Sequence, residues 1–139
     1  MMLRAILTGL CCVFFSVPAG AQPYRAINWL YVVPVSQNSF EVIDDGRSSA
    51  KDFWCAGSDY ARAFGLDGVR KRLYILDPLG DSKTTAGAKG VMFTVSPDDA
   101  MKNTPSSYSV SVKRGNENLA ISHAYNFCDT LLDGVFGRF

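Results

Sequence analysis

Residues 48–64, SSAKDFWCAGSDYARAF, decide how this chain folds. The apolar and small residues of the segment recur at steps of three and four, which is typical of an amphipathic helix with one buried face. They are Ala50, Phe53, Trp54, Gly57, Tyr60, Ala61 and Phe64. Ser49 offers an N-cap, Asp52 suits the first turn, and Gly65 is a natural residue beyond the end. We therefore predict one long helix whose aromatic residues belong to the core.

The rest of the chain is typical of strands and loops around this helix. The apolar or alternating segments that predict strands are 24–35, 40–43, 72–76, 91–95, 108–113 and, briefly, 119–121. A short helix is expected after Ser96-Pro97, and a last helix from Ser122 to Leu132. The order β-β-α-β-β-(short α)-β-α predicts the α+β class. We expect a mainly antiparallel sheet of about five strands, packed against the long helix and the C-terminal helix.

The N-terminus has the features of a signal peptide. Residues 1–4 are a short cationic segment, residues 5–17 are an uncharged apolar run, and Ala19-Gly20-Ala21 has the small-residue pattern that signal peptidase cleaves. The apolar run is too short to span a bilayer as a stable helix. We predict that residues 1–21 are removed, that no membrane span remains, and that the protein is periplasmic or secreted.

The cysteines indicate how the domain is crosslinked. Cleavage after Ala21 leaves only Cys55 and Cys128. In an oxidising compartment two cysteines most simply form one disulfide bond, whereas two free thiols or an intermolecular bridge are the alternatives. We predict a Cys55–Cys128 bond within a single domain over residues 22–133, followed by a flexible tail over residues 134–139.

The charge balance bears on the kind of partner. The chain has 14 Lys and Arg residues against 13 Asp and Glu residues, and the loss of Arg4 with the leader makes the two counts equal. A neutral chain does not favour binding to nucleic acid or to an anionic membrane surface. We expect a monomer whose partner, still unknown, is an envelope protein or a small ligand.

Several short motifs carry a resemblance to known proteins. They are Trp54-Cys55, Asp59-Tyr60-Ala61, Arg72-Leu73-Tyr74-Ile75, Gly80-Asp81-Ser82, Val91-Met92-Phe93-Thr94-Val95 and the late Cys128. Together, over most of the chain after the leader, they resemble a small family of exported proteobacterial proteins of unknown function. The resemblance implies export and a paired cysteine, and it implies no activity.

The polar loop expected over residues 77–89 is the main candidate for a binding site. Its glycines, hydroxyl groups and two lysines suit an anion held by backbone amides, and loops of this length are often functional. It is not a P-loop, because the Gly-x-x-x-x-Gly-Lys-Ser/Thr order is missing and a strand follows. A mobile connection between two strands is the alternative. The candidate residues for ligand or partner contact are Asp81, Ser82, Lys83, Thr84, Thr85 and Lys89.

No set of catalytic or metal-binding residues emerges from the sequence. His123 is the only histidine, and Cys128 lies five positions from it, on a different face of the same predicted helix. Cys55 could meet His123 only through a tertiary contact. The pairs Asp44-Asp45 and Asp98-Asp99 are typical of turns and helix starts rather than of metal ligands. We therefore expect no metal, no cofactor and no assigned catalytic residue.

These observations lead to two hypotheses about function. The first is a non-catalytic binding or protein-interaction module of the cell envelope. The second is a small, hydrolase-like periplasmic enzyme that uses residues of the 77–89 loop. Trp29 and Tyr31, which share a face of the first predicted strand, fit either core packing or exposure on a binding surface.

Overall fold

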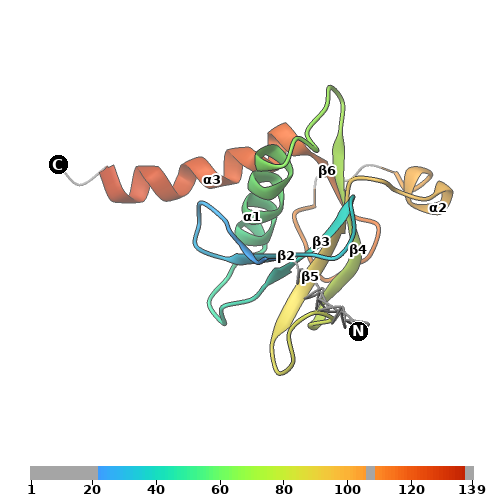
Figure 1. Ribbon diagram of the computed structural model, residues 1–139. Helices are drawn as coiled ribbons and strands as arrows, with labels where there is room; N and C mark the ends of the chain where they lie inside the picture. The colour runs from blue at the N-terminus through green and yellow to red at the C-terminus, as the bar shows by residue number, and fades with distance from the viewer. Residues whose placement is uncertain (1–21, 106–108, 137–139) are drawn as a thin grey trace, which may run out of the picture.

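The computed structural model describes residues 22–105 and 109–136. It confirms the α+β class, with one antiparallel sheet covered on one face by α1, beside which α3 lies (Figure 1). The elements in chain order are β1 (Tyr24–Arg25), β2 (Tyr31–Pro34), β3 (Ser39–Ile43), α1 (Ala50–Ala63), β4 (Arg72–Asp81), β5 (Lys89–Thr94), α2 (Asp99–Lys102), β6 (Asn118–Ala120) and α3 (Ile121–Phe136). The predicted leader, residues 1–21, lies outside the described residues.

The sheet has six strands in the order β1-β2-β3-β5-β4-β6, where the sequence predicted about five. Every neighbouring pair is antiparallel. The register aligns two rows of buried residues across the sheet, Val32–Val42–Val91 and Phe40–Phe93–Ile75. Because strand side chains alternate between faces, both rows face α1 and form the core with it. The intervening residues of β2, β3 and β5 therefore belong to the opposite, outer face.

The long helix α1 forms as the sequence predicts. The Asp52 carboxylate accepts hydrogen bonds from the backbone N–H and the hydroxyl of Ser49, each at 2.7 Å, and so secures the first turn. Trp54 is buried, and its indole N–H donates to the Val110 carbonyl at 2.8 Å. The prediction that Phe64 belongs to the buried face is wrong, because Phe64 follows the last helical residue and is 57% exposed. Its ring meets the ring of Tyr24 edge-to-face and tilts against that of Tyr60 at the rim of the core.

The predicted disulfide is confirmed. The sulfur atoms of Cys55 in α1 and Cys128 in α3 lie 2.12 Å apart, and both residues are buried. Beyond the bond α3 extends out past α1 to Phe136 (Figure 1). It thus includes residues 134–136 of the segment predicted to be a flexible tail, whereas residues 137–139 lie outside the described part. No helix among the residues that the structure describes is long and apolar enough to cross a membrane.

The strand predicted over residues 24–35 is wrong in one respect, because it is broken into β1 and β2. Residues 26–30 form a turn in which the Ala26 N–H donates to the Leu30 carbonyl and the Trp29 N–H donates to the Ala26 carbonyl, each at 2.9 Å. Ala26 and Leu30 are nevertheless buried. The turn therefore has the apolar composition of a strand, because two of its side chains pack into the core.

The predictions for residues 108–113 and 77–89 are also corrected. Residues 109–113 do not form a strand, because the carbonyls of Val110 and Val112 accept single bonds from Trp54 and Leu79 instead of a ladder. Residue 108 lies outside the described residues. β4 continues to Asp81, so the connection to β5 spans only residues 82–88. Register shifts between Ile75 and Gly80 disturb the alternation that would have marked this half of the strand.

Candidate functional site

The outer face of the sheet holds a buried carboxylate. Phe40 and Val42 of β3 face α1, so Glu41 between them belongs to the outer face, yet it is only 1% exposed. The tip of the β4–β5 hairpin surrounds its carboxylate. The donors are the Ser82 hydroxyl at 2.9 Å, the Lys83 N–H at 2.9 Å, the Thr84 N–H at 3.0 Å and the Thr84 hydroxyl at 2.5 Å. The hairpin tip is therefore attached to the middle of β3.

These contacts determine the charge of Glu41. Burial opposes ionisation of the carboxyl group, but the hydrogen bonds from Thr84, Lys83 and Ser82 favour the charged form more strongly. The pKa of Glu41 is consequently held below its usual range. The sequence predicted that the backbone amides of this loop could hold an anion. Two of those amides do hold one, and the anion is a side chain of the same protein.

A glycine makes room for this carboxylate on the neighbouring strand. Gly90 of β5 pairs with Ile43 of β3 and with Gly80 of β4. A Cβ atom at position 90 would lie 2.9 Å from Glu41 Oε1 and 2.9 Å from the Val42 carbonyl oxygen. Real Cβ contacts are not this short, so the side chain of Glu41 can lie across the sheet only where residue 90 is glycine.

Of the six residues predicted to contact a ligand, two bind Glu41 through their side chains and the other four lie at exposed positions of the hairpin. Ser82 and Thr84 point inward to Glu41, as described above. Asp81 and Lys89 are opposite each other at the exposed ends of β4 and β5. The Lys83 ammonium group lies 3.5 Å from the Asp77 carboxylate, and Thr85 is exposed. Contact between these residues and a ligand or partner stays a prediction.

An apolar groove of about 250 Å³ lies beside the hairpin tip on the outer face. Its lining residues are Pro23, Tyr31, Val33, Ile43 and Thr85. They come from β2, β3, the hairpin tip and the segment before β1, which is why no contiguous motif revealed the groove. Within the part of the chain that the structure describes, no acidic residue or histidine lines the groove. Its shape and composition suit an apolar side chain.

Arg25, Trp29 and Tyr31 form a cluster next to the groove, which we call the aromatic cluster. The Arg25 guanidinium carbon lies 5.2 Å from the centre of the Trp29 ring and 4.9 Å from that of Tyr31. The same guanidinium donates to the Tyr31 hydroxyl at 3.0 Å. Trp29 is 72% exposed and Tyr31 is 48% exposed. Tyr31 therefore belongs both to the cluster and to the wall of the groove.

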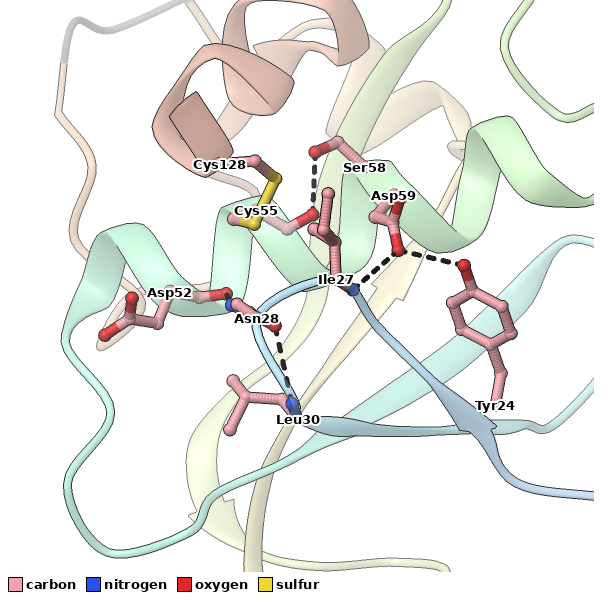
Figure 2. The surroundings of a disulfide bond; sticks show 9 residues. All are labelled: Tyr24, Ile27, Asn28, Leu30, Asp52, Cys55, Ser58, Asp59 and Cys128. Atoms are coloured by element: carbon pink, nitrogen blue, oxygen red, sulfur yellow. Dashed lines mark hydrogen bonds between the residues drawn. A yellow bond between two sulfur atoms is a disulfide. The ribbon is translucent and has the colours of Figure 1, made fainter. Parts of the chain in front are cut away.

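The turn that carries Trp29 is attached to α1 near the disulfide (Figure 2). One carboxylate oxygen of Asp59 accepts from the Ile27 N–H and from the Tyr24 hydroxyl, each at 2.9 Å. The Asn28 amide donates to the Asp52 carbonyl at 2.8 Å. Burial and the hydrogen bond to Asp59 raise the pKa of Tyr24 to about 12, so its hydroxyl remains a donor at neutral pH. The position of Trp29 is thus determined by the fold.

The residues considered for nucleophilic or metal chemistry do not assemble a site. Cys55 and Cys128 are bonded to each other, so neither is a thiolate. His123 is exposed on α3, and the centre of its ring lies 5.6 Å from that of Phe127. Within residues 22–105 and 109–136, no three His, Cys, Asp or Glu side chains are grouped so that they could hold a metal ion.

Comparison of this chain with protein families, with curated proteins and with solved structures found no match. The resemblance carried by the sequence motifs therefore stays a prediction.

Proposed function

We propose that the protein is a non-catalytic interaction module of the cell envelope. In this proposal the groove and the aromatic cluster bind a segment of another envelope protein that presents an apolar side chain next to a carboxylate. The buried disulfide supports an oxidising compartment such as the periplasm. None of the described residues that line the groove is acidic or a histidine, which favours binding over catalysis.

The observation that carries the proposal is the conformation of Trp29. Its φ angle is 71°, a left-handed conformation that costs a residue with a Cβ atom roughly 1–2 kcal/mol. Its indole ring is nevertheless mostly exposed, so burial of the ring does not offset that cost. A bulky aromatic residue held in a strained conformation on a well-attached turn is typical of functional sites. Tryptophan, tyrosine and arginine are also the residues that dominate binding energy at protein interfaces.

The charge of Arg25 indicates the chemistry of the partner. None of the salt bridges in the part of the chain that the structure describes involves Arg25, whose guanidinium instead lies close to two aromatic rings. A partner carboxylate would meet an unneutralised cation there, and complementary charge favours encounter and orientation. The adjoining groove would accept an apolar side chain of the same segment.

A displayed library of random peptides, panned against the purified protein, tests the proposal. We expect enrichment of peptides with an apolar residue beside Asp or Glu. Synthetic versions should lose binding to Trp29→Gly and Tyr31→Ala, and bind Arg25→Ala more weakly and with less salt dependence. Val69→Ala is the matched control, since Val69 is 96% exposed and lies outside the groove and the cluster. Peptides that bind the three variants of the groove and the cluster as well as they bind the parent protein would refute the assignment.

A further inference from the structure

A second concave site lies where the chain leaves α1 and where α3 begins. It is a cavity of about 310 Å³. Its lining residues are Arg62, Asp67, Gly68, Arg70, Lys71, Ala120, Ile121 and Ser122. Three of them are cations and one is an anion, so the cavity is positively charged although the whole chain has a formal charge of only +1.

The cations of this cavity are held in place by different elements. Arg62, in the last turn of α1, lies over the ring of Tyr125 with its guanidinium carbon 3.9 Å from the ring centre. It also lies 3.9 Å from the Asp67 carboxylate, which therefore offsets one of the three positive charges. Arg70 and Lys71 form no salt bridge with any residue that the structure describes. Two positive charges consequently remain unneutralised at one cavity.

The backbone brings these cations to the start of α3. The Lys71 carbonyl accepts a hydrogen bond from the Ile121 N–H at 3.2 Å, and the Lys71 N–H donates to the Gly68 carbonyl at 3.0 Å. The side chain of Lys71 runs across Gly68, whose hypothetical Cβ atom would lie 3.1 Å from Lys71 Cγ. The first turn of α3 contains no acidic residue, so the positive end of the helix dipole adds to the potential in the cavity.

We propose that this cavity binds a small phosphate monoester. Arginine and lysine are the side chains that recognise phosphate oxygens, arginine through paired N–H donors and lysine as a point charge. The volume is at the lower end of the range for small-molecule sites, which leaves room for a polar organic group beside the phosphate. Arg70 and Lys71 bind the phosphate oxygens, and Arg62 closes one wall.

Titration of the purified protein with glycerol phosphate, followed by amide NMR at constant ionic strength, tests the proposal. We expect saturable shifts confined to residues around the cavity. The affinity should fall about tenfold in Arg70→Ala and in Lys71→Ala, since each removes a charge-assisted contact. Lys113→Ala removes an exposed cation elsewhere and should bind like the parent protein.

Three results would overturn the assignment. The first is shifts that fail to saturate and that spread over exposed cations of the whole surface, which would indicate screening rather than a site. The second is unchanged affinity in both Arg70→Ala and Lys71→Ala. The third is an affinity for inorganic phosphate equal to the affinity for glycerol phosphate, which would show that the cavity does not recognise the ester group. The spectra of each variant also report whether it is folded, so lost binding cannot be confused with lost structure.

Discussion

Thr84 donates both its backbone N–H and its hydroxyl to the carboxylate of Glu41. The two residues are 43 positions apart, one at a hairpin tip and the other in the middle of β3. Together with Ser82 and Lys83, Thr84 fully encloses a charge that would otherwise be exposed on the outer face of the sheet. A loop with the composition of a ligand-binding loop is therefore part of the folded scaffold.

Glu41→Gln should destabilise the protein by roughly 1–3 kcal/mol. The carboxylate accepts four hydrogen bonds, and a glutamine amide would place its NH₂ group against donors of Ser82, Lys83 or Thr84. Urea unfolding monitored by circular dichroism measures the change. Asp81→Asn, a charge loss at the exposed end of the same hairpin, is the control and should change stability by less than about 0.5 kcal/mol. Equal effects of the two substitutions would contradict the role of Glu41.

Acid should weaken the fold partly through Glu41. The pKa of the folded carboxyl group lies below that of the unfolded chain, which is about 4.3, so the unfolded state binds the proton more readily. The stabilisation is fully present above the unfolded pKa and is lost as the pH falls through the folded pKa. Urea midpoints measured from neutral pH downward should fall less steeply for Glu41→Gln than for the parent protein.

Other carboxylates do not obscure this comparison. Asp45, whose pKa is also lowered, chiefly by the Ser48 hydroxyl, is present in both proteins and contributes equally to their acid sensitivity. The difference between the two curves therefore reports on Glu41. Parallel curves would show that its ionisation is not linked to folding.

Gly90→Ala should be strongly destabilising, by about 2 kcal/mol or more, because overpacking a rigid contact forces the backbone to move. The new methyl group would meet the Glu41 carboxylate and the Val42 carbonyl oxygen at 2.9 Å each. Thermal unfolding measures the loss. Gly115→Ala is the matched control, since a Cβ atom there meets nothing within 4 Å and should be tolerated. In Gly90→Ala combined with Glu41→Ala, part of the loss should be recovered.

The disulfide should account for a large part of the stability. It closes a loop of 73 residues, which in the loop-entropy account disfavours the unfolded chain by about 4 kcal/mol. The double variant Cys55→Ala/Cys128→Ala should therefore unfold at much lower urea. Thiol titration of the unfolded, unreduced protein should detect no free thiol. Detection of two thiols would show that the bond does not form in the purified protein.

Trp29→Gly should leave the free energy of unfolding within about 1 kcal/mol of the parent value. Glycine adopts the φ angle of 71° without strain, which offsets its greater flexibility in the unfolded chain and the lost stacking on Arg25. Trp54→Gly is the contrasting variant, since the buried indole of Trp54 should be needed for folding. A large stability loss in Trp29→Gly would mean that Trp29 is a structural residue, and it would remove the main support for the proposed binding surface.

Local patterns in the sequence determined the helix α1, the antiparallel α+β class and the pairing of Cys55 with Cys128. The helix was predictable because its buried face appears in the sequence as apolar residues at steps of three and four. The disulfide was predictable because the expected loss of the leader leaves one partner for each cysteine. The strand over 24–35 and the loop over 77–89 were misplaced, because a core-packed turn has the composition of a strand and a bulged strand loses its alternation.

Only the tertiary structure decided the surroundings of Glu41, the groove at Tyr31 and the basic cavity at Lys71. Each joins side chains from segments far apart in the chain, such as Glu41 with Thr84 and Lys71 with Ile121. Periodicity reports which residues face the core, but it does not report which polar groups will meet across the sheet. These contacts between polar groups depend on the strand order and on the bending of β4, and both arise from the packing of the whole chain.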